Sequence, residues 1–305
     1  MRRKKYIKYP YEYFAAQIEF GVRLAQIKKI SRRQSFLKYT DLYGSLTNHT
    51  FADNKKNKWV KKVLVKFEYL IKNVKDIDKL CIETYNLFLD TPYARISPDL
   101  PKKSDKLRFG CFRLNYSDYY RSRKIVRLHF SPTRAGLSQK NQEFRASDLS
   151  SIYINDRNKE FSEMINYIYN NPEKFEGATH FLSSTWMQSL PVYQSFFPVE
   201  SVNYRKPVEN IYMWLWGQFM KWDLSGNTKR YLEFKGKVRS AKMVSTVVAA
   251  IPFKVYEVCI PLEEMFKKYV PEYVDVPVVS ENISIPVQFD TSRPLRSHTV
   301  YQSEE

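Results

Sequence analysis

Apolar residues in the first ninety positions recur at the spacing of an α-helix. Two stripes carry this pattern, with the members Tyr13, Phe14, Ile18, Val22 and Ala25 in the first and Trp59, Val63, Phe67, Leu70 and Ile71 in the second. Ser31 and Gln34 have the spacing of a capping box, and Asp76 or Asp78 is suited to cap a further helix. Lysines and arginines occupy the opposite faces. The pattern predicts a basic helical region over residues 1–90.

A break in this pattern follows at 91–106. The segment contains Pro92, Pro98 and Pro101, which interrupt helices and strands alike. We therefore expect a connection between two domains here.

Beyond the break, apolar positions alternate as they do in β-strands. Strands are predicted at 107–116 and 124–131, joined by a polar segment suited to a hairpin. The second strand places Arg127 and His129 on one face, and its apolar residues on the other: Val126, Leu128 and Phe130.

Helical and strand patterns then succeed one another up to residue 270. Helices are predicted at 142–153, 156–170, 191–197, 240–250 and 262–269, strands at 178–186 and 253–260, and a hairpin where 211–222 and 228–234 flank the turn signal S-G-N at 225–227. The whole pattern predicts an α+β protein. Its predicted parts are a helical region (1–90), a connection (91–106), a mixed α/β domain (107–270) and a partly loose tail (271–305).

Charge is distributed unevenly along the 305 residues, whose formal net charge is +18. Residues 1–75 hold nineteen basic and five acidic residues, a net +14, whereas residues 271–305 hold two basic and six acidic residues, a net −4. A basic region of this kind suits nucleic acid or an anionic surface. The same charge also fits two simpler origins, because an AT-rich genome enriches lysine and because basic helix faces are often merely solvated.

The usual motifs for nucleotide and metal chemistry are absent from the sequence. It contains no G-x-G-x-x-G, no G-x-x-x-x-G-K-[ST], no H-E-x-x-H and no paired C-x-x-C. Its four histidines and three cysteines are far apart, so no metal site is expected.

Cellular location is inferred from the cysteines and the apolar runs. Cys81, Cys111 and Cys259 lie in apolar contexts, which fits buried reduced thiols in a cytoplasmic protein. The basic residues 1–5 precede no apolar segment of the kind found in secretory signals. The longest apolar run, 244–253, is shorter than the roughly 20 residues that cross a bilayer. We expect a soluble cytoplasmic protein, with a secreted effector as the alternative.

Four segments resemble a family of uncharacterised bacterial proteins. They are L-R-F-G-C-F at 107–112, V-R-L-H-F at 126–130, S-T-W-M-Q-S-L-P-V-Y-Q-S-F-F-P at 184–198 and W-L-W-G-Q-F at 214–219. The family has an R-x-x-F-G-C-F-type strand, V-R-L-H-F, S-W-L-Y-N-L-x-A-Y-R-R-L-F-P and S-L-W-G-Q-F. The resemblance covers roughly residues 10–245 and implies no activity.

A looser resemblance, over about 100 residues, is to the GNAT-like C-terminal domain of predicted acyltransferases. The counterparts here are L-H-F-S-P at 128–132, A-G-L-S at 135–138, the helices that follow, S-T-W at 184–186 and E-N-I at 209–211. The resemblance implies that the α/β domain is GNAT-like and that the protein takes its acyl group from an acyl thioester, with acyl-CoA as the donor.

The GNAT-like resemblance also implies roles for particular residues. Backbone N–H groups at the start of the helix after the central strand bind the acyl-CoA pyrophosphate, which assigns Arg134, Gly136 and Ser138 to this ligand. The family's Q/R-x-x-G-x-G/A loop is replaced here by a segment with one glycine. A splayed second strand offers backbone donors to the thioester carbonyl. Tyr193, on the next short helix, would protonate the leaving thiolate, and His129 is a candidate base.

Three tryptophans are candidate substrate contacts. Trp186 ends a predicted strand, while Trp214 and Trp216, two positions apart, would share one strand face and could stack on bases or sugars. Packing in the core is the alternative for all three and for Tyr193, and a structural role is the alternative for His129.

Two functions are therefore predicted. The first is an acyltransferase-like enzyme that moves an acyl group from an acyl thioester to an unidentified acceptor. The second is a non-enzymatic basic protein that binds nucleic acid or an anionic surface through residues 1–75.

Overall fold

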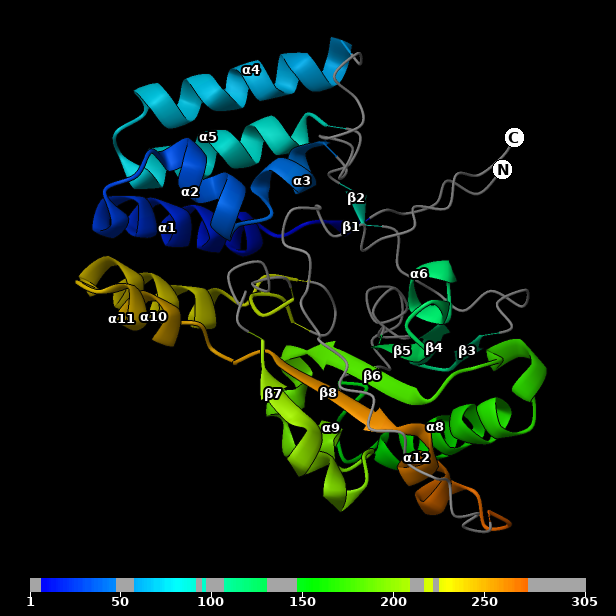
Figure 1. The fold of residues 1–305 in the computed structure, drawn as a ribbon. Helices are drawn as coiled ribbons and strands as arrows, with labels where there is room; N and C mark the ends of the chain where they lie inside the picture. Colours follow the sequence, from blue (N-terminus) through cyan, green and yellow to red (C-terminus); the bar gives the residue numbers. More distant parts are fainter. Residues whose placement is uncertain are drawn as a thin grey trace.

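Helices form the N-terminal part of the molecule and a six-stranded mixed sheet lies in the rest, which confirms the predicted α+β class (Figure 1). The computed structural model describes residues 7–47, 58–91, 95–96, 107–130, 147–208, 217–221 and 225–273. Two short strands, β1 (Ile7–Lys8) and β2 (Arg95–Ile96), pair antiparallel at the edge of the helical part.

Five helices follow one another in the N-terminal part, as the apolar stripes predict. They are α1 (Tyr11–Lys28), α2 (Arg32–Tyr39), α3 (Leu42–Thr47), α4 (Lys58–Asn73) and α5 (Ile77–Leu89). The Ser31 side chain accepts the backbone N–H of Gln34 and completes the capping box, and Asp76 caps α5 by accepting the N–H of Lys79. The capping predictions at Ser31 and Asp76 are confirmed.

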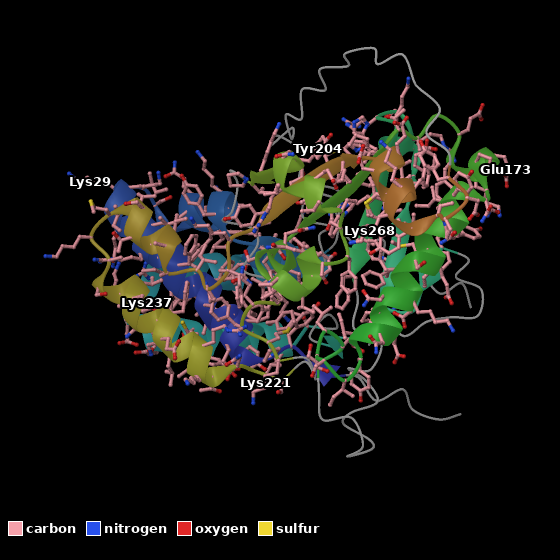
Figure 2. The ribbon with its side chains drawn as sticks, turned by 90° about the horizontal axis from the view of Figure 1, so that it is seen from below. Lys29, Glu173, Tyr204, Lys221, Lys237 and Lys268 are labelled. Carbon is pink, nitrogen blue, oxygen red and sulfur yellow. The ribbon has the colours of Figure 1, made fainter. Side chains whose placement is uncertain are left out.

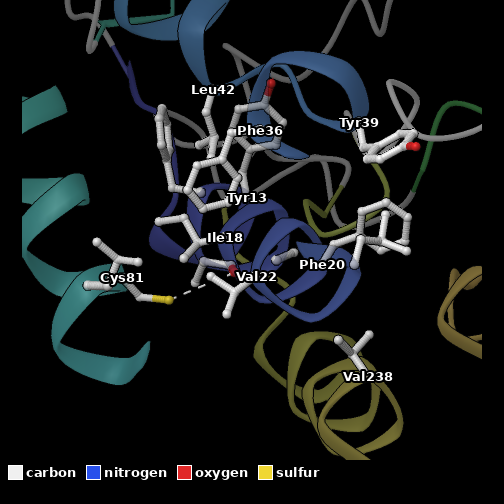
Figure 3. Packing of buried hydrophobic residues seen from close by; sticks show 14 of the residues in the cluster. Tyr13, Ile18, Phe20, Val22, Phe36, Tyr39, Leu42, Cys81 and Val238 are labelled. Atoms are coloured by element: carbon white, nitrogen blue, oxygen red, sulfur yellow. Dashed lines mark hydrogen bonds between the residues drawn. The ribbon is translucent and has the colours of Figure 1, made fainter. Parts of the chain in front are cut away.

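Helix α1 is the centre of the helical part. Figure 3 shows its residues Phe20 and Val22 between α2 on one side and Val238 of α10 on the other, with Cys81 of α5 alongside. Most of its side chains are buried, because the helix is apolar around most of its circumference.

Two helices from late in the sequence complete this helical core, namely α10 (Thr228–Ser240) and α11 (Val244–Ala249). A strand was predicted at 228–234, and that prediction is wrong. Tyr231, Phe234 and Val238 are three and four positions apart, so a helix buries all three together against α1. The side chain of Asn227 caps this helix by accepting the N–H of Arg230.

Residues from late in the sequence thus belong to the helical core. Those that lie within the segment 107–270 are Phe219, Tyr231, Phe234, Val238, Ala241, Val247, Ala250 and Ile251. An ion pair between Arg239 and the buried Glu19 holds α10 to α1, with Arg239 Nη2 2.5 Å from Glu19 Oε1. The physical reason is that the apolar stripe of α10 finds its partner surface on α1.

The mixed sheet has the strand order β3-β4-β5-β6-β8-β7. Its strands are β3 (Arg108–Phe109), β4 (Phe112–Asn115), β5 (Ile125–Phe130), β6 (His180–Thr185), β7 (Arg205–Pro207) and β8 (Tyr256–Pro261). Strands β5 and β6 are parallel, and the other neighbours are antiparallel. The predicted strands at 124–131, 178–186 and 253–260 are confirmed, whereas 107–116 forms two short strands around a tight turn.

Helices α8, α9 and α12 cover one face of this sheet (Figure 1). The helical elements of this part are α6 (Asp118–Arg121), α8 (Ile154–Tyr169), η2 (Pro172–Phe175), η3 (Trp186–Ser189), α9 (Pro191–Gln194), η4 (Val199–Tyr204) and α12 (Leu262–Tyr269). Val126 and Leu128 of β5 point into the core beneath these helices, so Arg127 and His129 lie on the opposite face, as the alternation predicts.

The helix predicted at 142–153 is wrong where the structure describes it, because 147–153 forms turns. The Ser147 hydroxyl accepts the N–H of Leu149, and such local side-chain bonds compete with helix formation. Asp148 turns inward to a buried ion pair with Arg157, 3.1 Å away.

The two parts lie at opposite ends of the molecule, as Lys29 and Lys237 at one end and Glu173 at the other show (Figure 2). Within the described ranges, no helix is both long and apolar enough to span a membrane. Most of the predicted tail, 274–305, lies outside the described residues.

Candidate functional site

Tyr193, the predicted proton donor, lies in the aromatic core beneath the sheet. Helix α9 begins at Pro191 and turns the Tyr193 ring toward Phe130 and Phe196, at centroid distances of 5.9 Å in both cases. The side chain is 1% exposed and its hydroxyl lies 3.3 Å from Ser183 Oγ. Burial raises the pKa of this hydroxyl above its ordinary value, which makes it a weaker acid. In this position Tyr193 is a packing residue.

His129, the predicted base, lies on the other face of the sheet. Its neighbour Phe130 points into the core, and alternation along β5 turns His129 to the side of Arg113, its cross-strand partner. The structure therefore does not bring the two predicted catalytic residues together.

The other predicted ligand contacts cannot be placed. Arg134, Gly136 and Ser138, predicted to bind acyl-CoA, and Trp214 and Trp216, predicted to contact substrate, all lie outside the described residues.

Trp186 is part of a joint between the sheet and the helical core. Its ring stacks on Phe253 with centroids 5.2 Å apart, and Gly217 lies against its indole with a φ of +77°. The buried amide of Gln218 donates to the Phe253 carbonyl and accepts the Phe253 N–H, at 3.0 and 2.9 Å. The next residue, Phe219, is buried in the helical core. The described part of the W-G-Q-F motif thus has a structural role.

At the centre of the sheet, the parallel strands β5 and β6 stop pairing partway along their length. The gap between them is a feature suited to ligand binding. Their parallel register pairs Ile125 with His180 and Arg127 with Leu182, and it ends there. The register gives no β5–β6 pairing for the last three residues of either strand, which leaves a gap in the ladder.

Polar side chains gather beside this gap, on the face of the sheet opposite the one that α8, α9 and α12 cover. Cross-strand register sets Ser184 opposite Glu257, and Lys206 opposite Glu257 on the other side. Extending the β5–β6 register by two residues sets His129 opposite Ser184, across the gap. We call His129, Ser184, Glu257 and Lys206, together with Arg127, the polar row.

Several atoms of the polar row are buried without being satisfied. Arg127 Nε, Ser184 Oγ and Glu257 Oε2 have no hydrogen-bond partner among the residues that the structure describes. The Arg127 guanidinium is held by the hydroxyl of Tyr120 and lies over its ring, 5.5 Å from the centroid. Twelve buried side-chain atoms in the described part of the chain lack a partner in this way, and three of them gather on this face, which makes it a candidate ligand site.

Electrostatics distinguish Glu257 within the polar row. Burial raises the pKa of its carboxyl above the ordinary value of 4.5, and the positive charges of Arg127 and Lys206 oppose this rise. Burial and the neighbouring Glu257 also raise the pKa of the Cys259 thiol to about 11. Glu257 is thus a carboxylate with increased proton affinity, next to a hydroxyl and two cations.

The sequence interpretation missed four of these five residues. Glu257 and Cys259 alternate with the apolar Val258 and Ile260, so the pattern shows which face of β8 is polar. It does not show which strand lies beside β8. The strand order, which the pattern does not contain, makes Ser184 and Lys206 neighbours of Glu257.

The donor set of the polar row does not suit a metal. In the described part of the chain, no three His, Cys, Asp or Glu side chains gather closely enough to hold an ion.

No protein-family model matches the chain, and searches of curated proteins and of solved structures give no match either.

Proposed function

We propose that this protein is an acyltransferase-like enzyme of GNAT-like architecture, which moves an acyl group from an acyl thioester to an acceptor bound over the polar row. The order of elements supports this proposal: a hairpin (β3–β4) leads to a central strand (β5), a helix (α8), a parallel strand (β6) and a short helix (α9).

The observation that carries the proposal is the gap between β5 and β6, bordered by the polar row. A thioester lying in the gap would have its carbonyl oxygen beside the backbone N–H groups of the strand edges, which can stabilise negative charge on that oxygen. An acceptor on the face of the polar row would then approach the carbonyl carbon from the side of Ser184 and Glu257.

Glu257 is the proposed general base in this reaction. It takes the proton of an acceptor amine or hydroxyl while the acceptor forms a bond to the carbonyl carbon. The carbon–sulfur bond then breaks and the thiolate leaves, to be protonated by water. A carboxylate with a raised pKa is a better proton acceptor than an exposed one, and such bases contribute about 100- to 10,000-fold to rates. The positive charges of Arg127 and Lys206 favour its ionised form.

The donor's phosphates do not bind at the described start of α8. Asp156 lies in its first turn, and the Arg157 guanidinium is already bound by Asp148 and Glu160, at 3.1 and 2.5 Å. Carboxylates at a helix start disfavour a pyrophosphate there. The proposal therefore names an acyl thioester as the donor and leaves the phosphate contacts to Arg134, Gly136 and Ser138 as a prediction.

Binding and turnover test this proposal in sequence. Calorimetry with acetyl-CoA, longer acyl-CoAs and an acylated carrier protein should reveal a donor that binds, and the release of free thiol with a panel of amines then measures transfer. If none of these thioesters binds, the proposal is wrong.

Glu257→Gln is the decisive variant for the role of the base. We expect it to bind the donor as the wild type does and to lose about 100-fold or more in turnover. Glu173→Gln, an exposed carboxylate at one end of the molecule (Figure 2) and outside the polar row, is the matched control and should keep full activity. Equal activity in the two variants would exclude Glu257 as the base.

A further inference from the structure

Helix α4 lies at the outer edge of the helical part (Figure 1), and most of its exposed residues are basic. Its buried residues lie on one side, and its exposed residues recur at three- and four-residue intervals on the other. We call these exposed residues the α4 stripe: Lys61, Lys62, Val65, Lys66, Tyr69, Lys72 and Asn73. Val65 and Tyr69 are 68% and 65% exposed.

Two open grooves border this region. One, of about 800 Å³, runs between α2 and α4 and is lined by Arg33, Tyr69, Lys72 and Lys75 among others. The other, of about 590 Å³, lies between the end of α1 and α2, and its lining includes Lys28 and Lys38. Tyr69 and Lys72 belong both to the α4 stripe and to the first groove.

Among the described residues, the two grooves are lined by more basic than acidic side chains. Among the described residues that line the two grooves, the one carboxylate is Glu68, which is already bound by Arg33 at 2.8 Å and by the Tyr43 hydroxyl at 2.7 Å. Arg32 is also occupied, because it donates to the backbone carbonyls at the end of α4. The lysines of the α4 stripe and of the grooves carry the remaining charge.

We infer that the α4 stripe and the adjoining groove bind single-stranded nucleic acid. An exposed aromatic ring between two lysines can stack on a base while the lysines neutralise flanking phosphates. Tyr69 has this position between Lys66 and Lys72, three residues away on either side. A bilayer surface fits less well, because interfacial helices insert a broad apolar face, and this stripe offers two apolar side chains beside a concave groove.

This inference is independent of the proposed acyl transfer. The α4 stripe lies on the helical part, on the far side of α1 from the sheet (Figure 1), and shares no residue with the polar row.

Fluorescence anisotropy of the full chain with a short labelled oligothymidine tests the inference over a range of salt concentrations. We expect Lys66→Gln combined with Lys72→Gln to weaken binding by about tenfold and to reduce the slope of log affinity against log salt by about 1.4, since each lost contact to single strands contributes about 0.7. Tyr69→Ala should weaken binding by about fivefold or more through lost stacking, whereas Tyr69→Phe should not.

Lys237→Gln combined with Lys242→Gln is the matched control. It removes the same charge from exposed positions at α10 and beyond it, away from the α4 stripe, and should leave the affinity within about twofold. Equal losses of affinity in the two double variants would show that the net charge of the protein, and not the α4 stripe, determines binding, and would overturn the inference. So would unchanged binding by Tyr69→Ala, or binding to phosphatidylserine vesicles with none to the oligonucleotide.

Discussion

Glu257 shows how a single residue combines a cost in stability with a chemical use. Its carboxyl is largely buried beside Ser184, and one of its oxygens is unpaired within the described structure. A buried, incompletely paired carboxylate disfavours the folded state when it is ionised. Binding sites commonly carry such costs, because the ligand supplies the missing partner.

The pH dependence of stability follows from this burial. The folded state holds the Glu257 proton more tightly than the unfolded chain, so Glu257 favours folding most below the ordinary pKa of 4.5. That contribution is lost as the pH rises through the raised pKa. Glu257→Gln cannot ionise, and we expect the wild type to lose stability relative to this variant over the same pH range.

Urea unfolding of both proteins at a series of pH values measures this difference. A gap that stays constant from acid to neutral pH would contradict the prediction.

At the scale of elements, a side chain of helix α8 holds the turn between β3 and β4 in place. Gly110 has a φ of +54°, and a Cβ placed there would lie 1.8 Å from the carboxyl carbon of Glu160. Glu160 in turn accepts the N–H of Cys111 at 3.0 Å and pairs with the buried Arg157. The absence of a side chain at Gly110 is what lets this carboxylate reach the turn.

A comparison of two glycines that both have a positive φ separates the cost of backbone strain from the cost of disturbing Glu160. Gly177 has a φ of +74° and no atoms near the place of a Cβ, so Gly177→Ala should cost about 1 to 2 kcal/mol from backbone strain alone. Gly110→Ala should cost about 2 kcal/mol more, because Glu160 must move and leave Arg157 without one partner. Urea denaturation measures both, and equal losses would show that the contact with Glu160 contributes nothing.

At the scale of the whole molecule, the helical core joins segments that are far apart in the sequence. The Arg23 guanidinium of α1 donates to the Ala241 carbonyl, 2.7 Å from its Nε, and Arg239 pairs with the buried Glu19. Helices α1 to α5 therefore leave part of their apolar surface uncovered when α10 and α11 are missing.

A fragment ending at residue 106 tests this dependence. It lacks the surface that covers Phe20 and Val22 of α1, so we expect it to bind a hydrophobic dye and to unfold without a cooperative transition, unlike the full chain. Cooperative unfolding of a monomeric fragment would show that the first ninety residues form an independent domain.

Elements that depend only on residues close together in the sequence could be predicted from the sequence. The stripes that predict α1 and α4 and the capping box at Ser31 depend on residues within a few positions of one another, and the structure confirms them. The alternation that places His129 and Phe130 on opposite faces of the sheet is likewise a property of a single strand. The strand predicted at 228–234 is wrong because aromatic residues suit a strand and a helix alike, and the helical spacing becomes visible only when Val238, beyond that range, is included.

The sequence by itself thus determined the α+β class, most elements and the face of each strand that is polar, because these follow from short-range periodicity. Tertiary structure alone decided that α10 and α11 join the N-terminal helices, that Tyr193 is buried away from His129, and that Ser184, Glu257 and Lys206 are neighbours on adjacent strands. Strand order and helix docking arise from contacts between distant segments, and alternation within a segment carries no information on its partner.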